Sequence, residues 1–419
     1  MLKGVTYLFG LALLVATLLA AVGVSAHAEE NFGAFSVSGY ADFRLIAPPR
    51  EVAWLNGGLS KFRYGNDEGQ FRFAEGVVQG AFKIDDEFSA VAVLRGEPEQ
   101  RTGIDMLEGY VSWHPAVSGP VSWSVKTGAF FPAISLENDD LGWASPYTLT
   151  PSAINSWIGE ELRTIGSEAI LRYDTGGLGT VSLTGAVTCC NDPAGVLMAE
   201  RGWAMDDRPS GIFSDMRLPD ATLRLFHEGV PGRTPMFDEI DGRPGWYAGL
   251  AWQMPGLGKL SVLRYDNEGD PNKVSGEYSA WDTRFWSYGA RTNWDQLVLI
   301  AQGLQGQTVI GTRFGLSYTF FQSAFLLASY DLAGVGAEDW RVSLRGDVFQ
   351  TRHPAATPSI MNEDGHAATV SLSWQHFDWL RLTGELIAMQ SRRREYLLDG
   401  FPAAALSQQE MQFSARFFF

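Results

Sequence analysis

Basic side chains recur at alternate positions of several segments whose intervening positions are apolar. Successive side chains of a β-strand point to opposite sides, so this spacing gathers the charges on one face. Acids share that face, among them Asp42 and Asp347. The face can therefore brace itself by ion pairs, or it can carry a net basic ring that attracts anions, and the sequence supports both interpretations. The basic residues are Arg44, Arg72, Arg95, Lys126, Arg172, Arg341, Arg345, Arg381 and Arg416.

The sequence shows no recognisable catalytic, metal-binding or phosphate-binding pattern. It has only 6 histidines, and no Ser, His and acid occur at a familiar spacing. We therefore expect no enzyme activity, no catalytic residue, no cofactor and no metal. A hydrolase stays an alternative, because catalytic triads assemble from positions far apart in a sequence.

The two cysteines, Cys189 and Cys190, are neighbours in the chain. A bond between adjacent cysteines is strained, and strained bonds are easily reduced. We favour two unpaired thiols at the end of a strand over a redox-sensitive bond.

The elements that position the charges are β-strands. In the last eleven residues, 409–419, Met411, Phe413, Ala415, Phe417 and Phe419 alternate with polar residues. One side suits lipid and the other suits water. A soluble fold rarely leaves an aromatic carboxy-terminus on an exposed strand edge. This ending is typical of a bacterial outer-membrane barrel, and we expect the barrel-assembly machinery to bind this strand.

The whole chain repeats this alternation and predicts an all-β antiparallel transmembrane barrel of about sixteen strands. An extra strand at 223–227, or a division of 315–332, would raise the number to eighteen. The predicted strands cover residues 35–45, 70–84, 88–97, 105–115, 120–131, 164–174, 179–188, 244–254, 259–267, 280–293, 296–307, 315–333, 339–351, 365–376, 379–391 and 409–419.

Short turns and long loops alternate between these strands, as they do in bacterial barrels, whose periplasmic turns are short. The chain also contains 14 Trp, 13 Tyr and 26 Phe, which suit aromatic girdles at the two membrane surfaces. Mean hydropathy is only −0.07. Much of the net charge of −16 lies in the loops, where it could join divalent ions to lipopolysaccharide. We expect outer-membrane lipid and lipopolysaccharide as partners, and no nucleic acid.

The N-terminus resembles a secretory signal. An uncharged stretch follows Lys3 and ends at Ala26, His27 and Ala28, an A-x-A cleavage pattern. We expect residues 1–28 to be removed, which leaves 29–419 as a single barrel domain. A retained membrane helix is the alternative, because the apolar run is long for a signal.

The long loop after the fifth strand, residues 132–163, is rich in aromatic residues and acids. It holds a possible short helix with Thr150 as its cap and Pro151 as its first residue. A sixteen-stranded barrel leaves an aqueous channel, so we expect this loop to fold inward and narrow it, although it could lie over the rim. The residues expected at the constriction are Glu137, Asp139, Asp140, Trp143, Tyr147, Trp157, Glu160 and Glu161.

This loop also carries a family resemblance. Its runs Glu137-Asn138-Asp139-Asp140, Ser145-Pro146-Tyr147 and Trp157-Ile158-Gly159-Glu160-Glu161, with the later run Asn362–Ala367, resemble porin-like proteins related to the phosphate-selective porin O and P family. The resemblance implies a sixteen-stranded, passive and trimeric channel. It does not extend to phosphate, because members of that family line the pore with lysine clusters and this chain has six lysines, none of them in the loop.

We therefore predict an outer-membrane porin that lets small hydrophilic solutes diffuse, with a preference for anions. The two alternatives are an outer-membrane hydrolase and a non-conducting barrel that acts as a surface anchor or adhesin.

Overall fold

The computed structural model describes residues 30–32, 34–66, 69–99, 101–225, 231–312, 315–354, 359–397, 400–401 and 403–419. The expected signal segment, 1–28, lies outside them. Among the described residues, no helix is long and apolar enough to cross a membrane.

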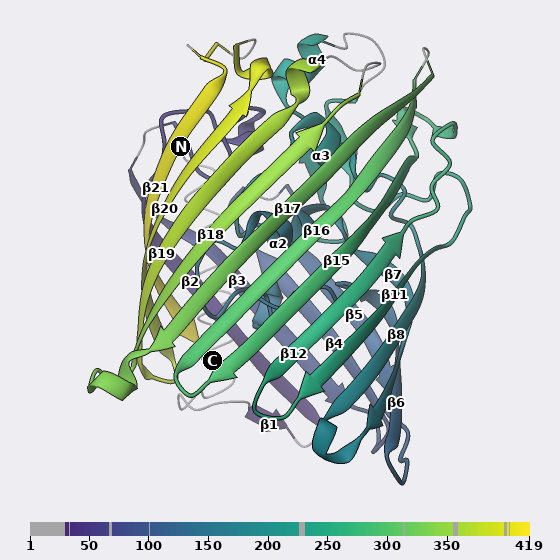
Figure 1. The fold of residues 1–419 in the computed structure, drawn as a ribbon, viewed down its shortest axis with the longest axis vertical. Helices are drawn as coiled ribbons and strands as arrows, with labels where there is room; N and C mark the ends of the chain where they lie inside the picture. Colours follow the sequence, from purple (N-terminus) through teal and green to yellow (C-terminus); the bar gives the residue numbers. More distant parts are fainter. Residues whose placement is uncertain are drawn as a thin grey trace.

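The wall is a closed antiparallel barrel of sixteen strands (Figure 1). The ring closes where the first wall strand pairs with the last, with Tyr40 opposite Phe418 and Ala47 opposite Met411. The wall strands are β2 (Phe35–Ala47), β3 (Gln70–Lys83), β4 (Phe88–Gly96), β5 (Ile104–Trp113), β6 (Val121–Phe130), β7 (Thr164–Asp174), β8 (Thr180–Cys189), β11 (Gly245–Met254), β12 (Gly258–Asp266), β15 (Trp281–Trp294), β16 (Leu297–Thr312), β17 (Gly315–Asp331), β18 (Trp340–Arg352), β19 (Glu363–Phe377), β20 (Leu380–Arg393) and β21 (Ala405–Phe418).

The predicted fold class is confirmed, and sixteen is the number of wall strands. The stretch that could have made an extra strand begins within helix α4 (Asp220–Leu225), and residues 315–331 form the single strand β17. Several strands are longer than alternation indicated, two of them by four residues or more: β16 continues to Thr312 and β21 begins at Ala405. Both extra stretches lie at the long-loop end, where the outward positions are no longer consistently apolar.

Alternation along each strand separates the two faces of the wall. On β21, Gln412 and Ser414 are buried inside, whereas Met411 and Phe413 are exposed outside. On β17, however, Phe321 and Phe325 point inward and are buried while Phe320 is exposed. The outer face is mainly apolar as predicted, but part of the inner face is apolar as well.

The remaining elements are short and lie in the connections. The hairpin β9–β10 and the helices α3 and α4 belong to the longest loop, 190–244. These elements are β1 (Glu30–Phe32), β9 (Asp215–Arg217), β10 (Arg233–Pro235), β13 (Val274–Ser275), β14 (Tyr278–Ser279), α2 (Ala153–Glu161) and α3 (Val196–Glu200), with single turns η1 (Trp54–Asn56), η2 (Leu141–Trp143), η3 (Gly176–Leu178), η4 (Leu332–Val335), η5 (Ser359–Met361) and η6 (Arg394–Leu397).

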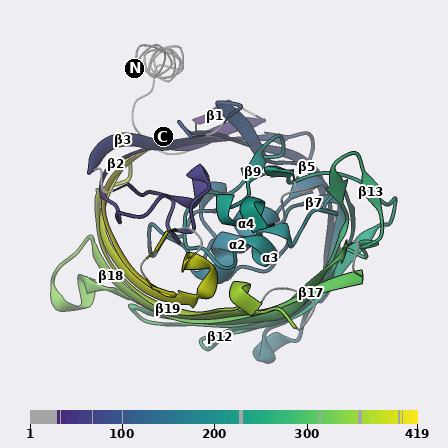
Figure 2. The same cartoon turned by 90° about the horizontal axis from the view of Figure 1, so that it is seen from above.

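Two long loops, together with residues 53–64 of the loop after β2, fill much of the barrel interior. Seen from above, α2 and α3 lie inside the ring of strands (Figure 2). Every residue of α2 is buried, and the helix contacts β17. The loop after the fifth wall strand therefore folds inward, as expected, but the loop 190–244 joins it there.

Candidate functional site: the loops inside the barrel and the arginines around them

Helix α2 is the centre of the loop 132–163. Its N-cap is Ser152, whose side chain accepts from the Asn155 amide, rather than the expected Thr150. The correction has a physical reason. The Thr150 amide donates to Glu385 on the wall, so this residue fixes the loop instead of starting the helix. Pro151 lies just before the cap.

An apolar cluster holds α2 against one side of the wall. Trp157 lies within 5.5 Å of the Phe285 and Phe321 rings and 6.0 Å from the Trp203 ring, measured between centroids. All four side chains are buried. Trp157 was expected at a constriction, whereas the packing of Trp203 was not foreseen. The loop 190–244 has no periodic pattern of apolar residues that would indicate a buried face, so the sequence did not predict the burial of Trp203.

Buried ion pairs hold the same loop to the wall. Glu137 accepts from Arg345 of β18 at 2.7 Å and from the Ser152 amide at 3.0 Å. Arg345 also pairs with Asp347 at 2.8 Å. Glu137 and Arg345, predicted separately as loop and wall residues, are thus direct partners in a network without solvent exposure.

The tip of the loop meets arginines of the wall near the short-turn end. Asp139 pairs with Arg291 at 2.5 Å, and Asp140 with Arg381 at 3.4 Å. The hydroxyl of Tyr147 accepts from Arg291 at 2.7 Å. Arg341 also lies over the Tyr147 ring.

The remaining predicted loop residues pack within the loops. Trp143 stacks on Phe131 with 4.1 Å between ring centroids and donates to the Asn155 carbonyl. Glu160 forms a bidentate pair with Arg201 of the second loop. Glu161 accepts from Trp157 at 2.6 Å, and burial raises the pKa of Glu161 to about 7.

Eight of the nine predicted wall cations form ion pairs with carboxylates. Arg95 pairs with Glu75, and Lys126 pairs with Glu168. Arg172 instead donates to Ser124. These ion pairs brace the wall, and the attraction of anions by the same residues stays a prediction. Arg44, Arg72, Arg341, Arg345, Arg381 and Arg416 form the other pairs.

The arginines on one side of the barrel form a ladder between the wall and the loop 190–244. Arg63 and Arg44 share Asp207, at 3.1 and 2.6 Å. Arg44 and Arg416 share Asp42, at 2.8 and 3.0 Å. At one end Arg72 shares Glu99 with Arg63, and at the other Arg381 lies opposite Arg416 in the strand register, near the short-turn end.

A pocket at the long-loop end opens above this ladder. It has a volume of about 480 Å³ and is lined by six arginines but only two acids, Glu99 and Asp215. The Arg101 side chain is 68% exposed. Three buried polar atoms of this pocket, the Nε atoms of Arg63 and Arg233 and the Tyr64 hydroxyl, have no hydrogen-bond partner among the described residues. The six arginines are Arg63, Arg72, Arg101, Arg208, Arg217 and Arg233. All but Arg72 come from loops, where strand alternation could not predict them.

The cysteine prediction is wrong. Cys189 and Cys190 are joined by a disulfide. Cys189 ends β8, and the chain turns at Cys190, whose φ is +66°. This turn, which the sequence pattern does not reveal, brings the two sulfur atoms together.

Comparisons with known proteins support the fold. No family model matches the chain, and no curated protein is similar in sequence. The outer membrane channel DcaP of Acinetobacter baumannii superposes with a TM-score of 0.55 at 10% identity, covering 93% of this chain and 99% of that one. OmpF of Salmonella typhi gives 0.52 at 10% identity, covering 94% and 100%. A trimer form of OmpT, an outer membrane protein of Vibrio cholerae, gives 0.51 at 7% identity, covering 92% and 99%. At these identities the likeness shows the fold, so the chain has the closed barrel architecture of outer-membrane proteins, and its resemblance to the phosphate-selective porin O and P family stays a prediction.

Proposed function

We propose that this protein is a channel of the bacterial outer membrane that lets small hydrophilic solutes diffuse passively, with a preference for anions. The observation that carries the proposal is the arginine pocket at the long-loop end, which continues into the arginine ladder along the inner wall. All six arginines form ion pairs, with the five acids Glu97, Glu99, Asp207, Asp215 and Asp220. The excess of one positive charge would concentrate anions at a narrow opening.

The placement in a membrane rests on the outer face of the barrel. Large apolar side chains such as Leu45, Leu183 and Leu344 are half exposed on it. Aromatic residues gather at the short-turn end, where Trp340, Trp374 and Trp379 mark a membrane surface. A closed barrel leaves no strand edge to hydrocarbon.

Because loops fill the interior, we expect the channel to conduct only intermittently. Arg44 and Arg95 are fully buried between the wall and the loops, so a solute passes only when these loops move away from the ladder. The contacts on this side are ion pairs that water and passing ions can replace. We expect a small, fluctuating conductance instead of the steady current of an open pore.

The experiment is swelling of liposomes that contain the purified protein. Small organic anions should enter faster than neutral sugars of the same size, and trisaccharides should be excluded. Equal swelling rates for anions and matched cations would contradict the anion preference.

A second candidate function is favoured by the apolar cluster around Trp157. If these contacts never open, the barrel is a non-conducting surface anchor, and liposomes will not swell with any solute. The proposal assigns no catalytic residue; covalent labelling by a serine-directed probe would contradict this. Assembly into trimers stays a prediction, checked by electrophoresis without boiling.

A further inference from the structure

The outer face of the barrel is not apolar everywhere. Outward positions of β2 are Phe35, Val37, Phe43 and similar residues, and those of β8 are equally apolar. On neighbouring strands from β16 to β20, by contrast, one row across the wall is polar. It consists of Gln305, Gln322, Gln350, Asp364 and Arg392, each opposite the next in the strand register.

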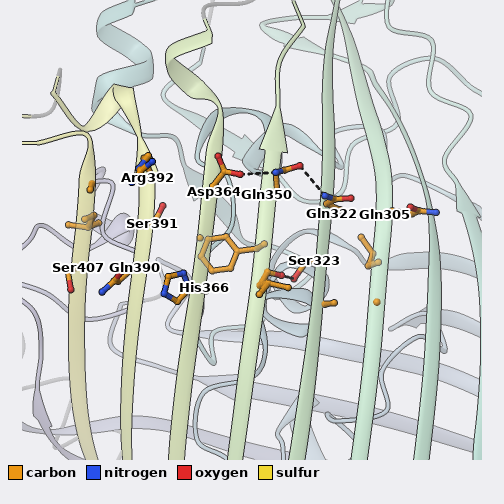
Figure 3. A pocket seen from close by; sticks show the side chains of 18 of the residues that line it. Gln305, Gln322, Ser323, Gln350, Asp364, His366, Gln390, Ser391, Arg392 and Ser407 are labelled. Carbon is orange, nitrogen blue, oxygen red and sulfur yellow. Dashed lines mark hydrogen bonds between the residues drawn. The ribbon is translucent and has the colours of Figure 1, made fainter.

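A groove of about 1020 Å³ runs along this row (Figure 3). Small residues make room for it: Gly303 and Ala324 lie in its lining, and the space where a Cβ of Gly303 would point is open. His366, Gln390 and Ser407 also line the groove, and Figure 3 shows them one step below the row. The groove is thus polar along its upper side.

Hydrogen bonds tie the row together. Gln322 donates to Gln350 at 3.0 Å, and Gln350 donates to Asp364 at 2.7 Å. Arg352 closes this chain on Asp364 at 2.5 Å. The side-chain carbonyl oxygen of Gln322 accepts a hydrogen bond from none of the described residues. It is therefore available to a ligand.

The depth of the row can be read along β18. Gln350 lies ten positions from Trp340, which belongs to the aromatic girdle of the short-turn end. At about 3.3 Å per residue and a tilt of about 40°, this distance spans roughly 25 Å, the height of the apolar band of such barrels. Gln350 and Asp364 therefore reach the headgroup boundary of the outer leaflet. Because the strands are tilted (Figure 1), the row descends toward Gln322 and Gln305.

Below the row, the wall offers little side-chain volume. Four residues below the row, the outward positions are small on four of the five strands, Ala301, Gly346, Ala368 and Ala388, and the fifth is Leu326 of β17. The space where a Cβ of Gly346 would point is open. Leu344 and Val370 follow toward the girdle. Hydrocarbon chains can lie close to the wall over these small residues.

The charge of the upper side is basic. A second groove of about 470 Å³ shares Gln305, Gln322 and Gln350 with the first and is lined by Arg264, Arg284 and Arg352. With Arg392, the described lining of the two grooves holds four arginines and one acid, Asp364. Asp266 and Asp282 form ion pairs with Arg264 and Arg284, so the four arginines exceed the three acids by one charge. Trp286 lies beside them, and Arg264 lies over its ring.

We propose that this outer groove binds a phosphorylated glycolipid of the outer leaflet. The arginines hold the phosphates, the glutamines and Asp364 bond to sugar hydroxyls, and the acyl chains lie over the small residues below. The polar-above-apolar arrangement matches an amphiphile in the orientation that the membrane imposes. A second copy of this chain fits less well, because the apolar faces of β2 to β8 would leave the glutamines buried without partners.

The inference rests on the placement of the barrel in an outer membrane, but not on conduction. Its test is native mass spectrometry of the full-length mature protein in detergent, with hexa-acylated lipid A that carries two phosphates as the probe. The same lipid without phosphates and phosphatidylethanolamine serve as comparison lipids. We expect one lipid A to bind and to survive dilution, at least tenfold more tightly than either comparison lipid.

The double variant Arg352→Gln/Arg392→Gln should lower this affinity at least tenfold, since each arginine near a lipid headgroup contributes about a fivefold change. The matched control is Arg394→Gln, which removes an exposed arginine two residues beyond Arg392 and outside the groove lining. Liposome swelling should be unchanged in the double variant. The two measurements therefore distinguish an error in the lipid-binding proposal from an error in the channel proposal.

Equal binding of lipid A with and without phosphates, or an equal loss in Arg394→Gln, would overturn the proposal. If the double variant does not fold, photo-crosslinking of the wild-type protein with a reactive lipid A replaces it, and the label should fall on residues 315–331 or 340–352. A cross-link between Gln322→Cys residues of two copies would show an interface between subunits instead and would also overturn the lipid site.

Discussion

Arg345 of β18 and Glu137 of the inward loop form an ion pair of 2.7 Å with no solvent exposure of either side chain. The pair joins two residues separated by 208 positions in the chain. It shows how the loop is held: the wall supplies the cation, and the loop supplies the acid that would otherwise be buried alone.

Replacing Arg345 by Gln should destabilise the protein by about 3–5 kcal/mol, because Glu137 and Asp347 would keep buried charges without a cation. The free energy of unfolding in urea, measured in lipid, checks this. The control is Arg341→Gln on the same strand, whose partly exposed pair with Asp331 should be worth less than about 1 kcal/mol. A similar loss of unfolding free energy in both variants would show that the buried pair contributes no more to stability than the partly exposed pair.

Glu161 predicts a pH dependence of the inner loops. Burial raises its pKa to about 7 from an ordinary 4.5, against the opposing hydrogen bonds from Leu197 and Trp157. Between pH 4.5 and about 7, Glu161 keeps its proton in the folded state but has lost it in the unfolded state. The contribution of Glu161 to the free energy of unfolding is therefore highest below pH 4.5 and falls as the pH rises to about 7. The full change is on the order of 3 kcal/mol.

Hydrogen exchange of the Leu197 amide, which donates to Glu161, measures this directly. Exchange should be slow at pH 5 and faster at pH 8 after correction for the intrinsic rate. The variant Glu161→Gln should remove most of the difference. An unchanged pH dependence in this variant would show that another group is responsible.

The mouth arginines should set the ion preference. Replacing Arg101 and Arg217 by Gln removes two partly exposed charges from the pocket without touching the buried ladder. The ratio of anion to cation permeability should fall severalfold, more at low salt than at high salt, because screening hides such charges. Arg243→Gln, an exposed arginine outside the pocket, is the control and should leave the ratio as it is.

The disulfide predicts a simple chemical result. Unfolded protein kept under non-reducing conditions should take up no maleimide, and two equivalents after reduction, at Cys189 and Cys190. Labelling of two thiols before reduction would restore the original sequence interpretation.

The wall could be predicted from sequence because its signal is periodic. The alternation of apolar and polar residues along 35–45 or 409–419 indicates a lipid-facing side. All sixteen strands were predicted from this pattern. The direction of the loop 132–163 was also foreseen, since an aromatic-rich segment must be buried somewhere. The N-cap at Ser152 was missed because the role of Thr150 depends on Glu385, a residue 235 positions away.

The filling of the barrel was beyond such reasoning. The contact of Trp203 with Trp157 and the convergence of Arg63 and Arg208 on Glu97 join separate loops, and no spacing in the chain encodes them. The sequence also indicated no face for Phe321 and Phe325, the buried inward residues of β17. Their inner partners come from the loops.

The most direct test of the account is single-channel recording of the purified protein in a planar bilayer under a potassium chloride gradient. The account predicts small, fluctuating openings whose reversal potential lies on the chloride side, and larger openings in Arg345→Gln, where the loop loses its hold on the wall. A bilayer that stays silent for both proteins, or a reversal potential on the potassium side, would contradict it.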